Sequence, residues 1–464
     1  MATAPWFVLG PNTLLSLYGL IRGPDRTVPT PAEDWRAAVV DVVVPCFREE
    51  DNIVLCLASV AAQSFKVRQV ILVDDGSGDR TVERAKRFAA DAGLSLLVIE
   101  RTTSIGKTPT IKRQAREFDH DVEFILDADT FLEDERYIER CVEELYQGVG
   151  IASACGTILP MRQRDRDALA ARPALAEHVG GDGFHDPFLD KRRGLKGIWW
   201  RLTNLYRETL YLFLQRFIYR GQMVFCGSIT NPVGCAVAYR RKYIVDLFDK
   251  YEPLFGDDLT NSEDIFIGFA LNSEGYRNIQ LDDVVARTEE PEAGRIPRQL
   301  YLWSSSFLQS CYYFDPLLRS PFKSLKRWRA HRRESEGEPG QTIQDKRKIK
   351  EQYRQAFGEK VTIEMGRPVG WVVFLSALEK VGFPTALIVM VLMQWWEPLA
   401  VTILAEAIIS VGVLIGISPG RRVRAFFKAI AVAPIRYLLL MADAVTIARF
   451  AGDLWITGNR QWRK

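Results

Sequence analysis

Residues 39 to 130 alternate between short apolar runs and longer segments that carry apolar residues at helical spacing. The short runs have the length of β-strands and cover residues 39–44, 70–73, 94–99 and 124–126. The longer segments cover residues 49–63, 81–92 and 108–118. Strands that alternate with helices in this way form βαβ units around a parallel sheet. The pattern therefore predicts an α/β fold.

Two of these predicted strands end in carboxylates. Asp74 and Asp75 follow the second strand, and Asp127 and Asp129 follow the fourth. Alternate residues of an extended chain point to the same face, so the side chains of Asp127 and Asp129 are expected together, about 7 Å apart. Ligands bind beyond the carboxyl ends of strands in open parallel sheets, and a carboxylate pair there suits a divalent cation that also holds a diphosphate. Four unrelated turn aspartates are the alternative, because aspartate is common in turns.

Four segments, in this order and spacing, resemble the donor domain of family-2 inverting glycosyltransferases. They are VVVPCFREEDNI (42–53), VILVDDGSGDRT (70–81), GKTPTIKRQA (106–115) and LDADTFL (126–132). The resemblance covers residues 38–310. It implies the GT-A nucleotide-diphospho-sugar fold, which is Rossmann-like, and a nucleotide-sugar donor with Mg²⁺ or Mn²⁺. It also implies that Asp129 is the direct metal ligand and that Asp127 lies at the sugar-diphosphate.

The same resemblance implies roles for four further residues of the donor side. Pro45 and Glu49 would border the pocket for the base, and Asp75 would contact the uracil or the ribose. Lys107, which follows a glycine, would lie near the uridine and the diphosphate.

A further carboxylate motif, NSEDIFIG, occupies residues 261–268 and precedes a predicted helix. It is similar to the Thr-Glu-Asp motif of membrane-embedded synthases, with Ser262 in place of threonine. The resemblance implies that Asp264 is the general base that removes the acceptor hydroxyl proton, and that Glu263 helps to bind the acceptor. The Gly-Asp-Asp at 256–258 resembles a motif of hyaluronan synthases and is a competing candidate, with helix-capping aspartates in a loop as the plainer explanation.

The segment QLYLW at residues 299–303 resembles the QxxRW motif of processive cellulose, chitin and hyaluronan synthases. The resemblance implies that Gln299 and Trp303 lie by the terminal sugar of the acceptor. Leu302 stands where the motif has arginine, and Arg298 lies one residue before the glutamine. This departure leaves tight coordination of the diphosphate, and so processivity, open. A structural tryptophan in the core is the alternative for Trp303.

The amino-acid composition argues against several classes of function. The net charge of the 464 residues is only +3 at pH 7, so no broad nucleic-acid surface is expected. Seven cysteines without CxxC or other metal spacing fit buried free thiols in a reducing compartment. Four scattered histidines argue against a histidine metal site, and His185 with Asp186 lies in a Gly/Asp-rich stretch that we interpret as a loop.

Membrane signals gather near the C-terminus. Residues 398–417 carry one charge, Glu406, and are long enough to span a bilayer. Residues 381–396 are apolar and end in two tryptophans, which suits an interface. The basic residues at 421–428 are expected on the cytoplasmic side, which would place the donor domain in the cytosol. Residues 425–450 are apolar but carry charges, so we predict two spans plus a hairpin or in-plane helix.

Three other segments are predicted at the membrane surface. Residues 198–219 and 321–333 mix aromatic and basic side chains, as helices on an anionic leaflet do. For the second of these, a solvated charged face is the alternative. Residues 5–21 are apolar but lack a basic start, so we interpret them as an anchor or interfacial helix and not as a signal peptide.

The sequence thus predicts a multi-pass enzyme of the inner membrane with a cytoplasmic catalytic domain. Its expected activity is metal-dependent, inverting transfer from a UDP-sugar of the glucose or N-acetylglucosamine type onto a growing β-linked polysaccharide. The alternatives are transfer of one sugar to a lipid-linked acceptor and a non-catalytic nucleotide-sugar-binding membrane protein. Expected partners are the UDP-sugar, a saccharide or lipid-linked acceptor, membrane lipids and further copies of the chain, but no nucleic acid. The predicted divisions are an N-terminal interfacial or anchor segment (1–36), a GT-A domain (37–310), an amphipathic linker (311–365) and C-terminal transmembrane and interfacial helices (366–464).

Overall fold

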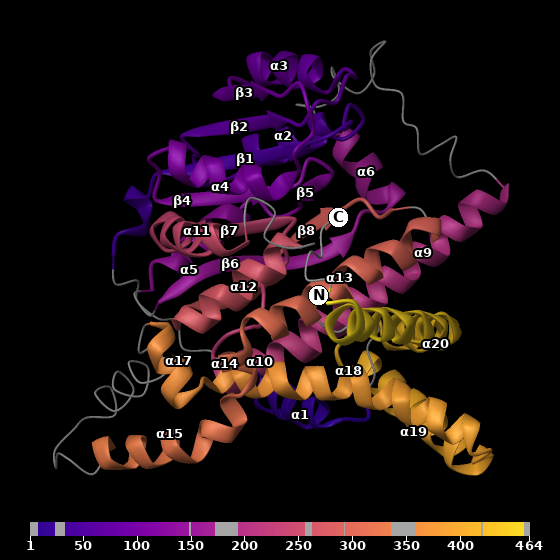
Figure 1. The fold of residues 1–464 in the computed structure, drawn as a ribbon. Coiled ribbons are helices and arrows are strands. Elements are labelled where there is room, and N and C mark those ends of the chain that lie inside the picture. The colour runs from indigo at the N-terminus through magenta and orange to yellow at the C-terminus, as the bar shows by residue number, and fades with distance from the viewer. Residues whose placement is uncertain are drawn as a thin grey trace.

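A mixed β-sheet covered by helices and a separate layer of long helices make up the structure (Figure 1). The computed structural model describes the following residues: 8–23, 33–147, 150–171, 194–255, 262–291, 293–335, 358–418 and 421–458. Two sequence predictions, the loop around His185 and Asp186 and the competing pair Asp257 and Asp258, lie outside these residues.

The N-terminal half of the sheet is parallel, as the sequence predicted. Its strands, in the spatial order β3-β2-β1-β4, are β1 (Val40–Cys46), β2 (Gln69–Asp74), β3 (Leu96–Glu100) and β4 (Val122–Leu126). The connecting helices are α2 (Ile53–Ala61), α3 (Thr81–Ala92) and α4 (Lys107–Glu117). Strand residues such as Val42, Val43 and Val44 have no exposed surface. Helices on both faces explain why these strands read as continuous apolar runs.

The second half of the sheet is mixed. Its strands are β5 (Thr130–Leu132), β6 (Ile151–Pro160), β7 (Ala236–Arg240) and β8 (Arg277–Thr288), and they complete the order β4-β7-β6-β8-β5. Strand β7 is antiparallel to both β4 and β6, and β5 is antiparallel to β8. The prediction of a parallel sheet, made for the strands that form β1 to β4, holds for them, whereas the later strands include the parallel pair β6 and β8 and the antiparallel strands β5 and β7. Strand β5 follows β4 directly, and the strands after β5 are joined through helical connections. Those connections include α5 (Tyr137–Leu145), α6 (Gln163–Ala170), α11 (Arg241–Phe255) and α12 (Glu263–Glu274).

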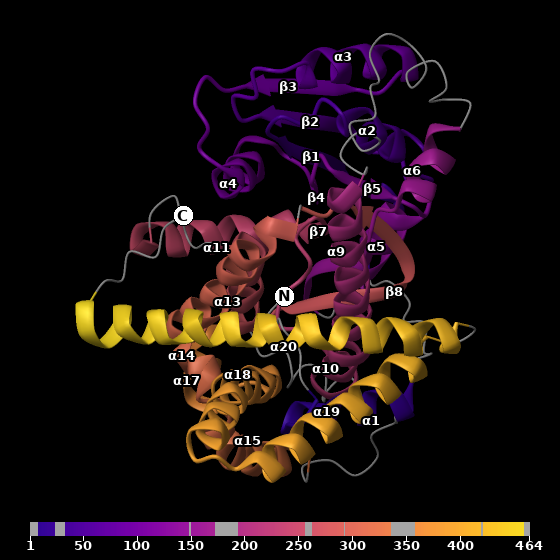
Figure 2. The same ribbon diagram turned by 90° about the vertical axis from the view of Figure 1, so that its right-hand side faces the viewer.

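Below the sheet lies a layer built from distant parts of the chain (Figures 1 and 2). Its helices are α1 (Pro11–Arg22), α10 (Arg220–Cys226), α13 (Ile296–Tyr313), α14 (Asp315–Leu318), α15 (Ser320–Ser335), α17 (Glu359–Met365), α18 (Pro368–Leu392), α19 (Trp396–Gly416) and α20 (Arg422–Gly452). Helix α9 (Gly194–Phe213) descends to this layer from the sheet and continues as a π-helical segment, Leu214–Tyr219. Short 3-10 turns at Trp35–Ala37 and Ala293–Arg295 and a π turn at Asp453–Thr457 complete the described elements.

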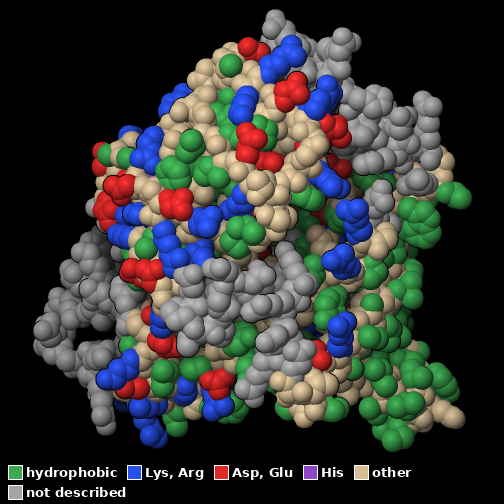
Figure 3. Space-filling view, turned by 45° about the horizontal axis from the view of Figure 1, so that its top comes forward, with side chains coloured by type: hydrophobic (Ala, Val, Ile, Leu, Met, Phe, Trp, Pro, Cys, Tyr) green, Lys and Arg blue, Asp and Glu red, His purple; other side chains and the backbone are tan. Residues whose placement is uncertain are grey.

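Three helices of the described chain are long and apolar enough to cross a membrane: Pro368–Leu392, Trp396–Gly416 and Arg422–Thr457. This differs from the predicted two spans plus a hairpin or in-plane helix, because the charged segment 425–450 lies inside one continuous helix, α20. There Arg436 pairs with Glu406 and Asp443 pairs with Lys380. Helix α18 lies across the view in Figure 1 and α20 lies across it in Figure 2, so the two helices cross rather than run parallel. Green apolar side chains gather at the lower right of Figure 3, whereas charged side chains are spread over the upper part and the lower left.

The three predicted surface segments differ from one another. The segment 198–219 does not lie on a membrane surface over its length, because Tyr206, Phe213 and Phe217 are buried in the core. Helix α15, in contrast, exposes the large side chains of Phe322, Leu325 and Trp328. Helix α1 exposes Leu14, Tyr18 and Ile21 and buries its polar and small residues instead, which is the arrangement expected of a helix that faces lipid.

Candidate active site

The donor side is built at the carboxyl ends of β1, β2 and β4. Asp75 follows β2 and accepts hydrogen bonds from Arg101 Nη1 (3.0 Å), Ser104 Oγ (2.5 Å) and the backbone N–H groups of Ile105 (3.0 Å) and Gly106 (2.9 Å). Burial opposes ionisation of Asp75, but these hydrogen bonds lower its pKa below the ordinary value. The carboxylate therefore holds the loop that leads into α4, and its predicted contact with a nucleotide stays a prediction.

Lys107, the first residue of α4, joins the two carboxylate motifs. Its Nζ lies 2.6 Å from Asp127 Oδ1 and 3.0 Å from Glu263 Oε1, and it donates to the Gly234 carbonyl at 3.0 Å. Burial opposes the charge on Lys107, but Asp127 and Glu263 raise its pKa well above the ordinary value. The structure therefore brings the predicted diphosphate motif and the predicted acceptor motif to one ammonium group.

A cluster of carboxylates surrounds Asp129. The side chain of Asn52 donates to Glu49 Oε2 at 2.9 Å and to Glu289 Oε2 at 2.8 Å, and the backbone N–H of Glu289 donates to the Asp129 carbonyl at 3.1 Å. Burial, followed by the charges of Glu49 and Asp127, raises the pKa of Asp129 well above its ordinary value. Burial and the nearby carboxylates also raise the pKa of Glu49 to about 7. Pro45 lies next to last in β1, paired with Val73 at the same edge of the sheet.

This cluster fits a divalent cation through its chemistry. Its donors are carboxylate oxygens, which Mg²⁺ and Mn²⁺ prefer. Burial, together with the charges of Glu49 and Asp127, raises the pKa of Asp129, so a bound cation would favour its ionised form. Within the described chain, no three His, Cys, Asp or Glu side chains are arranged closely enough to hold a metal by themselves. An ion bound here would therefore complete its coordination with diphosphate oxygens and water, as Mg²⁺ usually does.

Asp264 lies in the first turn of α12 and faces the segment before β7. Its Oδ2 accepts from the Gly234 N–H at 3.1 Å, and its Oδ1 accepts from Ser262 Oγ at 2.5 Å and from the Ile265 N–H at 2.8 Å. A Cβ on Gly234 would lie 2.8 Å from the Asp264 Cβ, so glycine is needed for this close approach. Three donors thus fix the carboxylate beside the lysine that contacts Asp127.

The predicted acceptor residues Gln299 and Trp303 lie one turn apart on α13. Ser306, one further turn along, donates to the Ser262 carbonyl at 3.3 Å, so this face of α13 packs on the segment that carries Asp264. The guanidinium of Arg207, from α9, lies 4.7 Å from the centre of the Trp303 ring. It also donates to Gln299 Oε1. The structure thus brings the two motif residues together with an arginine that is 92 residues away from Gln299 in sequence.

Two residues of this region were not predicted from the sequence as site residues. Glu289 follows the end of β8 and joins the Asp129 cluster. It could have been found by the pattern that identified Asp129, a carboxylate directly after a predicted strand. Arg207 was interpreted as one of several basic residues on a membrane-surface helix. Nothing within α9 marks it, because its role depends on contacts with the segment after β8 and with α13.

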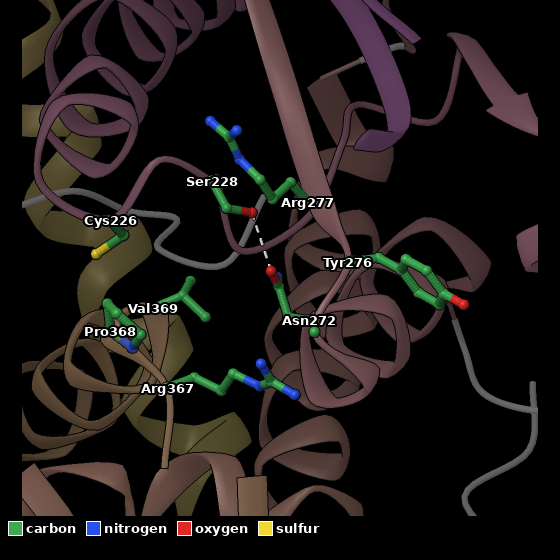
Figure 4. A pocket seen from close by; sticks show the side chains of 9 residues that line it. Cys226, Ser228, Asn272, Tyr276, Arg277, Arg367, Pro368 and Val369 are labelled. Carbon is green, nitrogen blue, oxygen red and sulfur yellow. Dashed lines mark hydrogen bonds between the residues drawn. The ribbon is translucent and has the colours of Figure 1, made fainter. Parts of the chain in front are cut away.

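A cavity at the junction of the sheet domain and the helical layer contains none of the predicted site residues (Figure 4). It lies between the start of β8, the end of α12 and the start of α18. Ser228 donates to Asn272 Oδ1 at 2.9 Å on one side, and Arg367 lies on the other. The chemistry of the carboxylate motifs is therefore separate from this cavity.

Residues 41–248 match the family model described as glycosyl transferase family 2. The N-acetylglucosaminyltransferase of Mesorhizobium japonicum is 26% identical over 303 residues, which are 64% of this chain and 62% of that protein. The N-acetylglucosaminyltransferase of Bradyrhizobium diazoefficiens is 25% identical over 280 residues, 59% of this chain and 50% of that protein. The chain therefore spans between half and two thirds of the length of these curated relatives.

Shorter or more distant similarities extend the comparison. The undecaprenyl-phosphate 4-deoxy-4-formamido-L-arabinose transferase of Pectobacterium carotovorum is 34% identical over 127 residues, 27% of this chain and 38% of that protein. Among solved structures, the mannosyltransferase PcManGT of Pyrobaculum calidifontis, in complex with GDP-Man and Mn²⁺, aligns with 96% of this chain and 94% of its own at 15% identity and a TM-score of 0.49.

Proposed function

We propose that this chain, a family-2 glycosyltransferase by its domain at residues 41–248, is a membrane-bound inverting enzyme that transfers a sugar from a UDP-sugar to a saccharide acceptor. One observation supports this most directly. Lys107 lies within 3.0 Å of both Asp127 and Glu263, so the donor and acceptor motifs, more than 130 residues apart in sequence, meet at one place. Inverting transfer requires this proximity, because the acceptor oxygen attacks as the diphosphate departs.

The proposed reaction is a single displacement. The acceptor hydroxyl oxygen forms a bond to the anomeric carbon while the bond from that carbon to the diphosphate oxygen breaks, and the nucleoside diphosphate leaves with the bonding electrons. Asp264 accepts the hydroxyl proton as general base. Its two oxygens are already fixed by Gly234, Ser262 and the helix backbone, which orients the carboxylate before the acceptor arrives. Attack opposite to the leaving group converts an α-linked donor into a β-linked product.

Asp129, with Asp127 beside it, would hold Mg²⁺ or Mn²⁺. When bound, the cation would supply positive charge at the departing diphosphate. Lys107 supports this arrangement from the protein side, because its ammonium group already lies 2.6 Å from Asp127 and carries a stabilised charge. The raised pKa values of Asp129 and Glu49 support a cation here, since the binding of one would offset their mutual repulsion.

For the substrate, we propose a UDP-sugar of the glucose or N-acetylglucosamine type and a growing β-linked polysaccharide. The rhizobial relatives are N-acetylglucosaminyltransferases, which favours an N-acetylhexosamine donor. Trp303 offers an apolar ring for a pyranose and Gln299 offers polar contacts to its hydroxyls. Pro45, Glu49 and Asp75 are proposed to border the nucleotide from the ends of β1 and β2.

The second candidate function is transfer of one sugar to a lipid-linked acceptor. Leu302 removes the motif arginine that processive synthases carry, and one relative acts with undecaprenyl phosphate according to its name. Either function places the acceptor near the helical layer. We therefore propose that the layer of α18, α19 and α20 binds the membrane from the cytoplasmic side of a bacterial inner membrane, with the sheet domain in the cytosol.

The domain divisions belong to the same proposal. The sheet domain comprises residues 37–310 and the C-terminal membrane layer comprises residues 366–464, with the segments 1–36 and 311–365 at the surface between protein and lipid. The exposed apolar side chains of α1 and α15 support these assignments.

The test is a nucleotide-release screen with the full chain in detergent or nanodiscs. Purified protein would be incubated with UDP- and GDP-sugars, Mn²⁺ or Mg²⁺ and a saccharide or polyprenyl-phosphate acceptor, and products would be sized by mass and digested with linkage-specific glycosidases. We expect release of UDP and a β-linked product. A ladder of products supports the polysaccharide function, whereas a single added sugar supports the lipid-linked function.

An Asp264→Asn protein prepared in parallel serves as the control for contaminating hydrolases. Release that persists in this variant does not come from the proposed site. If the unmodified chain releases no nucleotide from any donor while it still binds UDP, it is a nucleotide-sugar-binding protein and the proposed enzyme function is wrong.

A further inference from the structure

The predicted acceptor motif, QLYLW at residues 299–303, lacks the arginine of the QxxRW pattern. No residue next to it in sequence replaces that arginine. Position 302 is leucine. Arg298, the nearest arginine along the chain, is exposed at the start of α13. A guanidinium is nevertheless present at the motif, and it comes from a different element.

Arg207, in the middle of α9, has no exposed side-chain surface. Its guanidinium carbon lies 4.7 Å from the centre of the Trp303 ring, within the range of cation–π contact. Its Nη2 donates to Gln299 Oε1, and its Nε lies 3.4 Å from Glu290 Oε2. One buried side chain thus contacts both predicted acceptor residues and is balanced by one carboxylate.

These contacts determine which face of Trp303 is open and in which direction the amide of Gln299 points. Since the guanidinium covers one face of the Trp303 ring, a sugar can stack only on the opposite face. Since Gln299 Oε1 accepts from Arg207, its amide N–H₂ group points away from the arginine. Among the described residues that amide nitrogen has no hydrogen-bond partner, so Gln299 is oriented to donate to an oxygen of the acceptor.

The same arginine is connected to the donor side through the segment that follows β8. Glu289 and Glu290 are consecutive in that segment, and their side chains make contacts on different sides. Glu289 joins Asn52 in the carboxylate cluster, and Glu290 pairs with Arg207. The next residue of α9, Glu208, pairs with Arg162 and with Lys428 of α20, which holds the helix in place on its other side.

We propose that Arg207 is the positioning residue of the acceptor site, a role distinct from the diphosphate contact that an arginine at position 302 would make. It acts through Trp303 and Gln299: it fixes the open face of the indole and the donor direction of the amide. This inference rests on the proposed function, and it assigns to α9 a role in recognition of a sugar acceptor. The donor cluster does not depend on it.

The test compares acceptor and donor kinetics in matched variants of the full chain. Arg207→Lys keeps a positive charge for Glu290 but loses the planar group that stacks and bridges. Arg207→Gln with Glu290→Gln removes both charges, so that no unpaired charge stays buried. Arg298→Gln removes the exposed arginine beside the motif and is the control.

We expect both Arg207 variants to lower kcat/KM for the acceptor by about tenfold or more. The KM for the UDP-sugar and the rate of acceptor-free UDP release should stay within about twofold of the unmodified chain. Arg298→Gln should change neither, and thermal unfolding should confirm that all variants are folded.

The inference is overturned if Arg207→Lys keeps full acceptor kcat/KM, because the planar group is then not needed. It is also overturned if a folded Arg207 variant loses acceptor-free UDP release as strongly as transfer, because the residue then acts on the donor. These outcomes require an unmodified chain that turns over, so they differ from failure of the proposed function, in which the unmodified chain releases no nucleotide at all.

Discussion

The donor side and the acceptor side of the site are built in different ways. On the donor side, Asp75 is held by residues 101–106, at most 31 positions away, and Asp127 and Asp129 belong to one strand end. On the acceptor side, Gln299 and Trp303 are held by Arg207, which lies on another helix. The residues that mark the proposed donor side thus lie mostly in short segments, with Glu289 added from beyond the end of β8. The proposed acceptor side exists only where α9, α13 and the segment after β8 meet.

The two sides also differ in their balance of charge. The donor cluster carries several carboxylates and raises the pKa of its members, which prepares it for a cation. The proposed acceptor side pairs one buried arginine with one buried carboxylate, Glu290, although burial raises the pKa of Glu290 to about 7 as well. The two sides therefore differ in the number of carboxylates for each cationic side chain, and we expect the acceptor side to provide orientation.

The largest expected effect tests the donor cluster. Replacing Asp127 and Asp129 together by alanine should lower turnover by at least about a thousandfold, because the charge at the diphosphate is worth several kcal/mol. Chelation of divalent ions should have the same effect in the unmodified chain, measured by UDP release. Asp282→Asn, at an exposed position of β8, is the control. Unchanged turnover in the double variant would show that the cluster is not the diphosphate site.

The next effect tests the junction of the two sides. Asp264→Asn should lower transfer by about a hundredfold to a thousandfold, since a positioned base contributes on this order. UDP binding, measured by calorimetry, should stay within about twofold, because Asp264 contacts Gly234 and Ser262 rather than the donor edge. A variant that transfers sugar normally would remove Asp264 from the role of base.

A third prediction concerns the helical layer below the acceptor side. Lys380 of α18 lies 2.6 Å from Asp443 of α20 and donates to Ser304 of α13 at 2.8 Å. Asp443→Asn should cost about 3 kcal/mol of stability, because it leaves a buried ammonium without its counter-charge. Thermal unfolding in detergent would measure this loss.

The matched comparison for that prediction is Lys380→Met with Asp443→Leu, which removes both charges and should cost clearly less. Arg422→Gln at an exposed position of α20 should have no effect. Equal losses in the single and double variants would mean that packing, and not charge, sets the stability here.

The smallest effect concerns the opposite edge of the sheet, where the buried carboxylate of Asp41 is held by several partners. Asp41 is buried, which by itself would raise its pKa, but hydrogen bonds from His120, Arg68 and Gln69 lower it to about 2. Because the folded value lies below the unfolded value of 3.8, this stabilisation is present above about pH 4 and is lost as the pH falls toward 2. It amounts to about 2 kcal/mol.

Asp41→Asn should therefore lower the free energy of unfolding by about 2 kcal/mol at pH 7 and by much less near pH 2. Urea unfolding at a series of pH values measures this slope. Glu83→Gln, at an exposed position of α3, should leave the slope unchanged. An Asp41→Asn protein with the same acid sensitivity as the unmodified chain would contradict the assignment.

The sequence by itself determined the first four strands, the helices between them and the α/β class of the fold, all of which are confirmed. Helix α3 begins and ends at the predicted residues, Thr81 and Ala92. These features follow from periodicity, which acts over a few residues. Asp127 and Asp129 were identified by their place at a strand end and Asp264 by its resemblance to a synthase motif, and their catalytic roles stay predictions.

Only the tertiary structure decided which distant residues meet. An aromatic and basic pattern describes both a helix on lipid and a buried helix whose arginine is paired, and α9 proved to be the second kind because Glu290 and Trp303 cover Arg207. Likewise, the charges within residues 425–450 suggested a hairpin or in-plane helix, whereas the structure pairs Asp443 with Lys380 and Arg436 with Glu406 inside one helix. Burial of a charge depends on its partner, and a partner 63 residues away leaves no periodic trace in the sequence.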